Sequence, residues 1–299
     1  MNSNSKHDAE YIALRSMTGL FQLLPYNAAL STGVALAWVS HFLFGFRRKE
    51  AHKRIKNVFG SKYSDKEISR IAWLSWRNVI LNYVEICRIH KSGPEFMVKR
   101  YEICNADKVY DHIDKHKGCI LATPHMGNWD QSAVPFVQRG APLFSIAGRQ
   151  KNPKTNNLIN DLRNSLGIYI LTRGGSTMRS VIDNLCNGKV LAILPDIRMK
   201  TPDLEVSFLG GKANLGKGMA FFARKANCPI FPAICKRVGL SEHTVTFFDP
   251  IYPDPALDKK EDIERMTKLV VDIVDNAINE QPEQWFWYNK RWVLDPVES

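Results

Sequence analysis

The stretch Thr123-Pro124-His125-Met126-Gly127-Asn128-Trp129-Asp130 stands between an apolar run and a helical pattern. The residues before it, 119–122, form a short apolar run that predicts a buried strand. Pro124 ends that strand, and Asn128 is a candidate N-cap for a helix that continues through Val134 and Val137. The stretch therefore predicts a strand-to-helix turn in an α/β fold.

Two side chains in this turn have the chemistry of a catalytic pair. His125 lies in the predicted turn and Asp130 in the first turn of the helix, with Gly127 between them to let the chain turn tightly. We expect Asp130 to reach one imidazole nitrogen while the other faces a cleft, because open α/β sheets place their sites at the C-terminal ends of strands. A histidine held in this way is a general base for a hydroxyl. Since many histidines have structural roles instead, the pair needs support from the rest of the chain.

The spacing His125-x4-Asp130 matches the signature of the glycerolipid acyltransferase superfamily, and the longer string resembles the late acyltransferases of lipid A biosynthesis, the lauroyl- and myristoyl-transferring enzymes. Five further motifs carry the same resemblance, in order along nearly the whole chain: Arg149–Pro153, Leu194–Asp196, Phe208–Gly211 through Gly216–Gly218, Pro229–Pro232 and Pro282–Trp287. The chain departs from the family after Pro195-Asp196, where Ile197 stands in place of the usual Gln.

The resemblance implies an α/β three-layer sandwich with a mixed, largely parallel sheet flanked by helices, as in glycerol-3-phosphate acyltransferase. It implies an acyl carrier protein as donor and a hydroxyl of a Kdo-bearing, phosphorylated lipid A precursor as acceptor. The chain has no Gly-x-Ser-x-Gly elbow, reactive-cysteine context or metal-ligand spacing, so we expect direct transfer without an acyl-enzyme, a metal or a cofactor. Two alternatives stay open: an acyltransferase that uses acyl-CoA or another glycolipid or lysophospholipid, and a non-catalytic protein that binds anionic lipid.

Further candidate residues follow other predicted strands. Arg149 comes after an apolar run and can hold a phosphate bidentately, and the resemblance assigns its motif to acceptor binding. Asp196 also follows a strand, where it could orient Arg149 or Arg198 or cap a helix. The loop with Gly210, Lys212 and Asn214 is expected to join a strand to a helix, and its amides could face the thioester oxyanion.

The remaining pattern alternates strands and helices, which predicts the α/β class. The expected strands are 118–123, 143–147, 168–171, 189–194, 204–208, 230–236 and 243–248. The expected helices are 128–139, 154–166, 176–187, 214–227 and 258–280, with a helical region over 50–92 in which Ser64 and Glu67 form a candidate capping box.

The N-terminal region predicts contact with a membrane. No charged residue occurs between Met17 and Phe46, and residues 26–46 are long enough to cross a bilayer. A basic cluster follows directly, so the positive-inside rule places the rest of the chain in the cytoplasm. We therefore divide the chain into a membrane-anchoring segment, 1–48, and a catalytic domain, 49–299. The resemblance to the lipid A acyltransferases implies that this membrane is the bacterial inner membrane. An interfacial helix and a buried core helix are the alternatives.

The composition of the chain limits the classes of molecule that it can bind. The net charge of +11 calls for an anionic partner, such as a membrane surface or an acidic carrier protein. Nucleic acid is not predicted, because the chain has no zinc-finger spacing or RNA-recognition signature. The six scattered cysteines predict a reducing compartment rather than a disulfide framework or a metal site. The mix of aromatic and basic residues at 285–292 suits a membrane interface.

Overall fold

The computed structural model describes residues 3–148 and 150–296. Its centre is a seven-stranded sheet in the order β1-β9-β8-β2-β5-β3-β4, in which β8 and β9 are antiparallel and all other neighbours are parallel. The strands are β1 (Tyr101–Cys104), β2 (Cys119–Ala122), β3 (Leu143–Ala147), β4 (Tyr169–Thr172), β5 (Val190–Ile193), β8 (Ile230–Val238) and β9 (Glu242–Phe247). A separate hairpin pairs β6 (Leu204–Phe208) with β7 (Gly211–Leu215).

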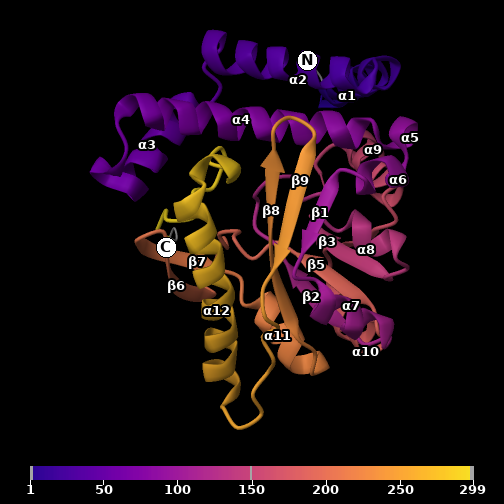
Figure 1. The fold of residues 1–299 in the computed structure, drawn as a ribbon, viewed down its shortest axis with the longest axis vertical. Coiled ribbons are helices and arrows are strands. Elements are labelled where there is room, and N and C mark those ends of the chain that lie inside the picture. The colour runs from indigo at the N-terminus through magenta and orange to yellow at the C-terminus, as the bar shows by residue number, and fades with distance from the viewer. Residues whose placement is uncertain (1–2, 149, 297–299) are drawn as a thin grey trace.

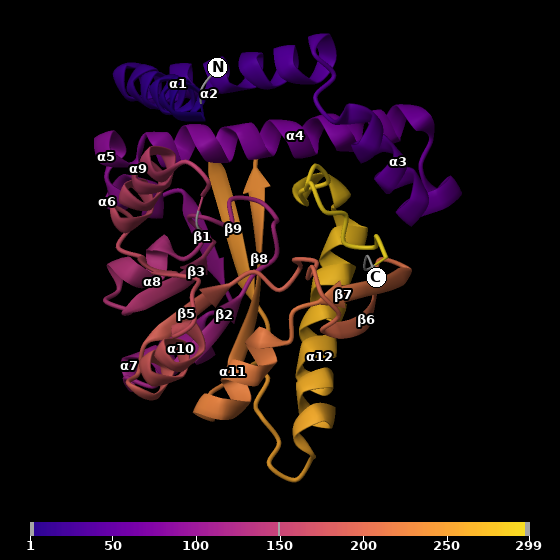
Figure 2. The same cartoon turned by 180° about the vertical axis from the view of Figure 1, so that it is seen from behind.

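Helices cover both faces of the sheet, as Figures 1 and 2 show. In the buried strand β2, Ile120 and Ala122 belong to a core shared with one set of helices, whereas Cys119 and Leu121 belong to a second core. The first set contains α10 (Thr177–Cys186), α11 (Gly218–Ala226) and α12 (Lys259–Glu280), and the second contains α7 (Asp107–Asp114), α8 (Val134–Gln138) and α9 (Pro153–Asn164). The expected mixed, largely parallel α/β sandwich is confirmed.

The predicted elements mostly exist, with three differences. Strands β1 and β7 were not expected, and β7 takes the first residues of the helix predicted over 214–227, so α11 begins at Gly218. Residues 129–133 form turns, so α8 covers only the end of the helix predicted over 128–139. Asn128 therefore caps no regular helix. Its side chain donates to the Glu85 carboxylate of α4 instead.

A long helix, α4 (Asp65–Cys87), crosses one end of the sheet (Figure 1). Its start is the predicted capping box: the Ser64 hydroxyl accepts from the Glu67 amide, and the Glu67 carboxylate accepts from the Ser64 amide. Before it come α3 (Arg48–Phe59) and a 3₁₀ turn (Gly60–Lys62), and after it the short helices α5 (Ile89–Ser92) and α6 (Pro94–Val98).

The N-terminal region does not form the single helix expected over 26–46. Pro25 separates α1 (Ser3–Leu23) from α2 (Tyr26–Trp38), and α2 passes into a π-helical turn, Val39–Leu43. Of the described helices, none is by itself long and apolar enough to span a membrane. The pair Tyr26–Leu43 and Arg48–Lys62, bent by 85°, passes that test together, on length and composition alone.

Helices α1 and α2 lie on the side of α4 that faces away from the sheet (Figures 1 and 2). They form a third core with α4, in which Phe21, Ala29 and Leu30 pack against Leu81 and Val84. Part of the basic cluster after them is used inside the protein. Arg54 is buried and donates to the carbonyls of Trp287 and Asn289 at 2.8 and 2.7 Å.

Candidate active site

His125 lies at the carboxyl end of β2, in the segment 123–133 between β2 and α8, which has no helix or strand. We call this segment the His125 loop. Strand β2 pairs in parallel with β5, and the register sets Ala122 opposite Ile193. Because parallel strands end at the same edge of a sheet, the segments that follow them lie side by side. His125, three residues after β2, therefore meets Asp196, three residues after β5.

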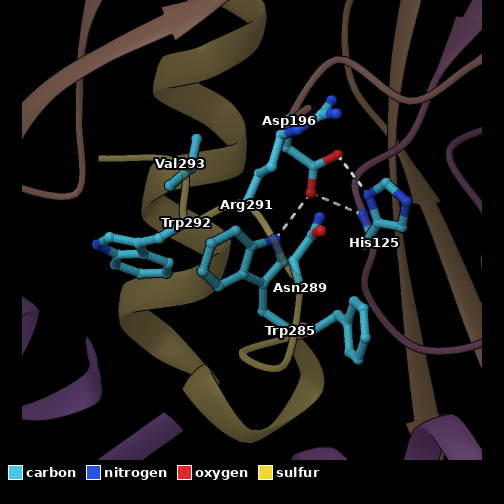
Figure 3. Close-up of a pocket in the computed structure, with 8 residues that line it drawn as sticks. His125, Asp196, Trp285, Asn289, Arg291, Trp292 and Val293 are labelled. Carbon is cyan, nitrogen blue, oxygen red and sulfur yellow. Dashed lines mark hydrogen bonds and ion pairs between the residues drawn. The ribbon is translucent and has the colours of Figure 1, made fainter. Parts of the chain in front are cut away.

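The His125 ring is held by Asp196 (Figure 3). Nδ1 of His125 lies 2.9 Å from Oδ1 of Asp196, and the backbone N–H of His125 donates to Oδ2 at 2.9 Å. The indole N–H of Trp285 also donates to Oδ2, at 2.8 Å. A carboxylate only accepts hydrogen bonds, so Nδ1 carries the proton and Nε2 has the lone pair. Nε2 makes no hydrogen bond with any residue that the structure describes, which leaves it available as a base.

Burial and charge set the proton affinities of this pair. The Asp196 side chain is 2% exposed and the His125 side chain 16%. Burial lowers the pKa of His125, but the charge and hydrogen bond of Asp196, with a smaller contribution from Asp130, outweigh burial and raise it above 6.5. Burial raises the pKa of Asp196, but the charge of His125 and the hydrogen bonds from His125 and Trp285 lower it below 3.8. Asp196 is therefore ionised at neutral pH.

Asp130 is not the partner of the imidazole nitrogen, contrary to the prediction. Its carboxylate instead binds Arg163 of α9, with Oδ1 3.0 Å from Nη2. The predicted contact required Asp130 to lie in the first turn of a helix starting at Asn128, and the chain forms irregular turns there. Asp130 remains close enough to His125 to act on it through its charge.

One opening is lined by His125 and Asp196, and a second lies behind Trp129, which contacts the His125 ring. The first is a notch of about 10 Å³, room for a single water molecule, whose lining includes His125, Phe286, Asn289 and Arg291. The second is a cavity of about 270 Å³ between the sheet and the His125 loop. Trp129 lines this cavity and meets the His125 ring edge to face, with centroids 5.2 Å apart.

The lining of the cavity mixes polar and apolar residues. Asp130 and Arg163 contribute the charged groups, while the apolar lining comes mainly from the strands β3, β4 and β5: Ile146, Ala147, Ile170, Ala192 and Ile193. Thr123, Trp129, Ala133 and Ala192 also line a smaller cavity of about 30 Å³, which reaches Phe136 and Phe247. Such a lining can contact an aliphatic part of a ligand with the strand residues and bind its polar groups with the others. Within the described residues, no group of three or more His, Cys, Asp or Glu side chains is placed to hold a metal ion.

A family model described as bacterial lipid A biosynthesis acyltransferase matches residues 8–293. The chain belongs to this acyltransferase family. Similar curated proteins are phosphatidylinositol mannoside acyltransferases. That of Mycolicibacterium smegmatis (strain ATCC 700084 / mc(2)155) is 23% identical over 201 residues, which cover 66% of this chain and 64% of the relative. That of Mycobacterium tuberculosis (strain CDC 1551 / Oshkosh) is 27% identical over 198 residues, which cover 63% and 60%. The chain thus spans less than two thirds of these relatives' length.

The other residues predicted from the family motifs have different surroundings. Arg149 lies outside the described residues, although Gly148 and Gln150 beside it line the larger cavity. Asp196 was expected to bind the acceptor or orient an arginine, and it orients His125 instead. Arg198 does not pair with it: the guanidinium donates to the backbone carbonyls of Asp295, at 2.9 Å, and Pro296.

The loop expected to supply oxyanion donors is the β6–β7 hairpin and lines neither opening beside His125. Leu209 and Gly210 have φ of 51° and 72°, so they form a tight two-residue hairpin turn rather than a strand-to-helix loop. Lys212 pairs with Glu205 at 2.7 Å. Asn214 supports the hairpin by accepting from the amide of Asp203 at 2.8 Å.

The C-terminal family motif lies in the core rather than at a membrane interface. Trp285, Trp287, Tyr288 and Trp292 are all buried, with exposed fractions of 0 to 7%. We had assigned this segment to an interface because its composition mixes aromatic and basic residues. The role of Trp285 as a donor to Asp196 was missed, as was the pairing of Arg163, since no local pattern marks either contact.

Proposed function

We propose that this protein is an O-acyltransferase in which His125, oriented by Asp196, is the general base. The observation that carries the proposal is the hydrogen-bonded set of His125, Asp196 and Trp285, which fixes the tautomer with a free Nε2 lone pair. Membership of the family supports the reaction class. Asp130 would contribute its negative charge and, through Arg163, the shape of the cavity wall.

The reaction needs no group besides these side chains and the two substrates. Nε2 takes the proton from the acceptor hydroxyl, and the alkoxide oxygen forms a bond to the thioester carbonyl carbon. The carbon–sulfur bond then breaks, and the leaving thiolate takes the proton back from the imidazolium. The ionised Asp196 stabilises the imidazolium between these two steps.

The acyl chain of the donor would occupy the 270 Å³ cavity. Apolar strand residues form part of its lining, and Trp129, which contacts His125, lines it as well. The smaller cavity, which reaches Phe136 and Phe247, shares four of its lining residues. The acceptor would approach from the notch side, where Asn289 and Arg291 offer polar groups. Arg149, the predicted acceptor-binding residue, would add a phosphate-binding guanidinium.

Enlarging Ala192 should change the preferred acyl chain. Ala192 lies in β5 and lines both cavities, so the larger side chain of Ala192→Phe should occupy part of this space. We expect kcat/KM for the longest accepted chain to fall about tenfold or more while that for chains a few carbons shorter changes little, because small volume differences decide packing in apolar pockets. Rates over a series of acyl donors measure this. A uniform loss for every chain length would place the acyl chain elsewhere.

The acceptor is proposed to be a phosphorylated glycolipid. The family supports a lipid A precursor, and the similarity to phosphatidylinositol mannoside acyltransferases supports a mannosylated phosphatidylinositol as a second candidate. The donor is proposed to be an acyl carrier protein thioester, with acyl-CoA as the alternative. Purified protein incubated with both donors and both acceptors, and analysed by mass spectrometry, tests these assignments. If no acylated product appears with any combination, the protein does not have the proposed activity under these conditions, and a lipid-binding role gains support.

We also propose that α1, α2 and the segment 39–46 that follows them lie on the cytoplasmic face of a bacterial inner membrane. Ten of the large exposed apolar residues fall between positions 12 and 46, among them Leu23, Leu43 and Phe44 at 84, 66 and 80% exposure. A concentration of exposed large apolar side chains in one segment is typical of membrane contact. It also gives a glycolipid acceptor a short route to the enzyme.

Replacing Leu43 and Phe44 together by serine should reduce membrane binding. Burial of two large apolar side chains contributes about 3 kcal/mol or more, so we expect binding to phosphatidylglycerol-containing vesicles to fall at least about tenfold. Vesicle co-sedimentation measures this. Tyr252→Ser, at a position that is 56% exposed in the segment before α12, is the control and should bind as the wild type does. Equal binding of all three proteins would show that the membrane contact is elsewhere.

A further inference from the structure

Glu85 is a buried carboxylate that the proposed chemistry does not use. It lies on α4 with its side chain 0% exposed, and Arg237 of β8 is equally buried. Arg237 donates to Oε1 at 3.1 Å and to Oε2 at 2.5 Å. The same two oxygens have three further partners: Asn128 Nδ2 at 2.7 Å, the Tyr26 hydroxyl at 3.0 Å and His243 Nε2 at 3.3 Å. The charges of Arg237 and His243 outweigh burial and lower the pKa of Glu85 to about 2, so it is ionised.

This network forms hydrogen bonds with the His125 loop at two consecutive residues, Gly127 and Asn128. Asn128 donates to Glu85, and the carbonyl of Gly127 accepts from Nδ2 of Asn82 at 2.6 Å. Asn82 lies three residues before Glu85 on α4, and its Oδ1 accepts from Arg237 Nη2 at 2.6 Å. The ion pair of Glu85 and Arg237 therefore orders both side chains that reach the loop.

The loop has few backbone hydrogen bonds of its own, among them Met126 N–H to the Pro124 carbonyl and Ser132 N–H to the Asn128 carbonyl, so contacts with neighbouring elements also hold it. Gly127 has φ of 55°, and a Cβ at this position would lie 2.5 Å from the Cys235 carbonyl oxygen, so the loop backbone is pressed against β8. On the other side, the segment after α12 binds it: Gly127 N–H donates to the Gln284 carbonyl at 3.1 Å, and Phe286 N–H donates to the His125 carbonyl at 3.0 Å. The position of His125 is thus set from three sides, and α4 provides one of them.

We propose that Glu85, Asn82 and Arg237 are positioning residues for the proposed reaction, which hold Gly127 and Asn128 so that His125 stays against Asp196. The inference rests on the proposed function, because positioning has a meaning only if His125 acts in the chemistry. It predicts that loss of the hydrogen bonds from Asn82 to Gly127 or from Asn128 to Glu85 lengthens the contact between His125 and Asp196. The charged groups near the ring are Asp196 from the segment after β5, Asp130 from the loop itself and Arg291 across the notch. A longer contact with Asp196 lowers the pKa of His125.

The test compares Asn82→Ala and Asn128→Ala with a matched buried variant. Asn82→Ala removes the hydrogen bond to the Gly127 carbonyl. Asn128→Ala removes the hydrogen bond from the loop to Glu85 and leaves Glu85 and Arg237 paired. The control is Asp262→Asn. Asp262 is likewise 0% exposed. It binds Arg224 and Arg265, the latter at 2.6 Å, and accepts from the Asp254 amide, so among the described residues its hydrogen-bond partners lie outside the His125 loop. Melting temperature, kcat and KM, and the pKa of His125 from an NMR titration of the full-length protein are measured for each variant.

We expect both loop variants to lower kcat about tenfold or more, since small misplacements of a catalytic group have large effects on rate. KM for the donor should change little, and the NMR pKa of His125 should move down. Asp262→Asn should lower the melting temperature only. If Asn82→Ala and Asn128→Ala fold and keep the wild-type kcat and His125 pKa, the network is merely structural and the proposal is overturned. Should the wild type transfer no acyl chain, the NMR titration still decides whether the network positions His125, so the two failures are distinguishable.

Discussion

Replacing His125 by alanine should reduce acyl transfer by about 10²-fold or more, the usual contribution of a positioned general base. The reason is the free Nε2 lone pair: in His125→Ala no other described side chain in contact with Asp196 can accept a proton from the acceptor, since Trp285 is only a donor. The initial rate of acylated product formation, followed by mass spectrometry, measures the loss.

The fold should survive this change, because the backbone N–H of residue 125 can still donate to Asp196 and its carbonyl can still accept from Phe286. Circular dichroism and the melting temperature provide that control. Donor hydrolysis by water should fall with transfer, because water needs the same base. If folded His125→Ala protein keeps more than about half of the wild-type rate, His125 is not the base and the mechanism proposed above must be given up.

Local sequence patterns were sufficient for the elements on which the site is built. The apolar run before Thr123 gave the buried strand, Pro124 its end, and Ser64 with Glu67 the start of α4. The prediction that Arg149, His125 and Asp196 each follow a strand was also reasonable, and for His125 and Asp196 the described strand ends agree with it.

The partner of His125 could not be found in this way, because it depends on strand order. Asp196 is 71 residues from His125, and they meet only because β2 and β5 are neighbours in the sheet. A sequence shows where strands end but does not show which ends are adjacent. Asp130, five residues away, was the only carboxylate that local spacing could suggest.

A second kind of error came from turns. The Gly210-Gly211 pair was assigned to a loop before a helix, and it forms a hairpin because Leu209, which is not a glycine, also adopts a positive φ. Composition likewise misled at Trp285–Trp292, where the aromatic side chains are in the core. In both cases the prediction rested on local composition, and the contacts that decide the outcome are made with residues distant in the sequence.

Asp196→Asn should reduce kcat by about 10²-fold or more, because an amide in place of the carboxylate no longer fixes the proton on Nδ1 or stabilises the imidazolium. The same substitution should move the pH dependence. The base must be neutral to act, so activity rises with pH as His125 loses its proton. In the wild type, this rising limb of the pH–activity profile is centred above pH 6.5, because the pKa of His125 is raised. Removing the charge of Asp196 takes away the main cause that raises this pKa, so the limb of the residual activity moves to lower pH.

The matched comparison is Asp130→Asn, which also removes one negative charge near His125 but leaves the hydrogen bond to Nδ1 intact. Its charge contributes least among the causes that raise the pKa of His125, so its limb should move by a smaller amount in the same direction. Profiles of kcat/KM from pH 5 to 9 for both variants test this order. A larger shift in Asp130→Asn than in Asp196→Asn would mean that Asp130 holds the ring during turnover. The loop would then have to rearrange from the arrangement seen here, with Asp130 leaving Arg163 to bind the imidazole.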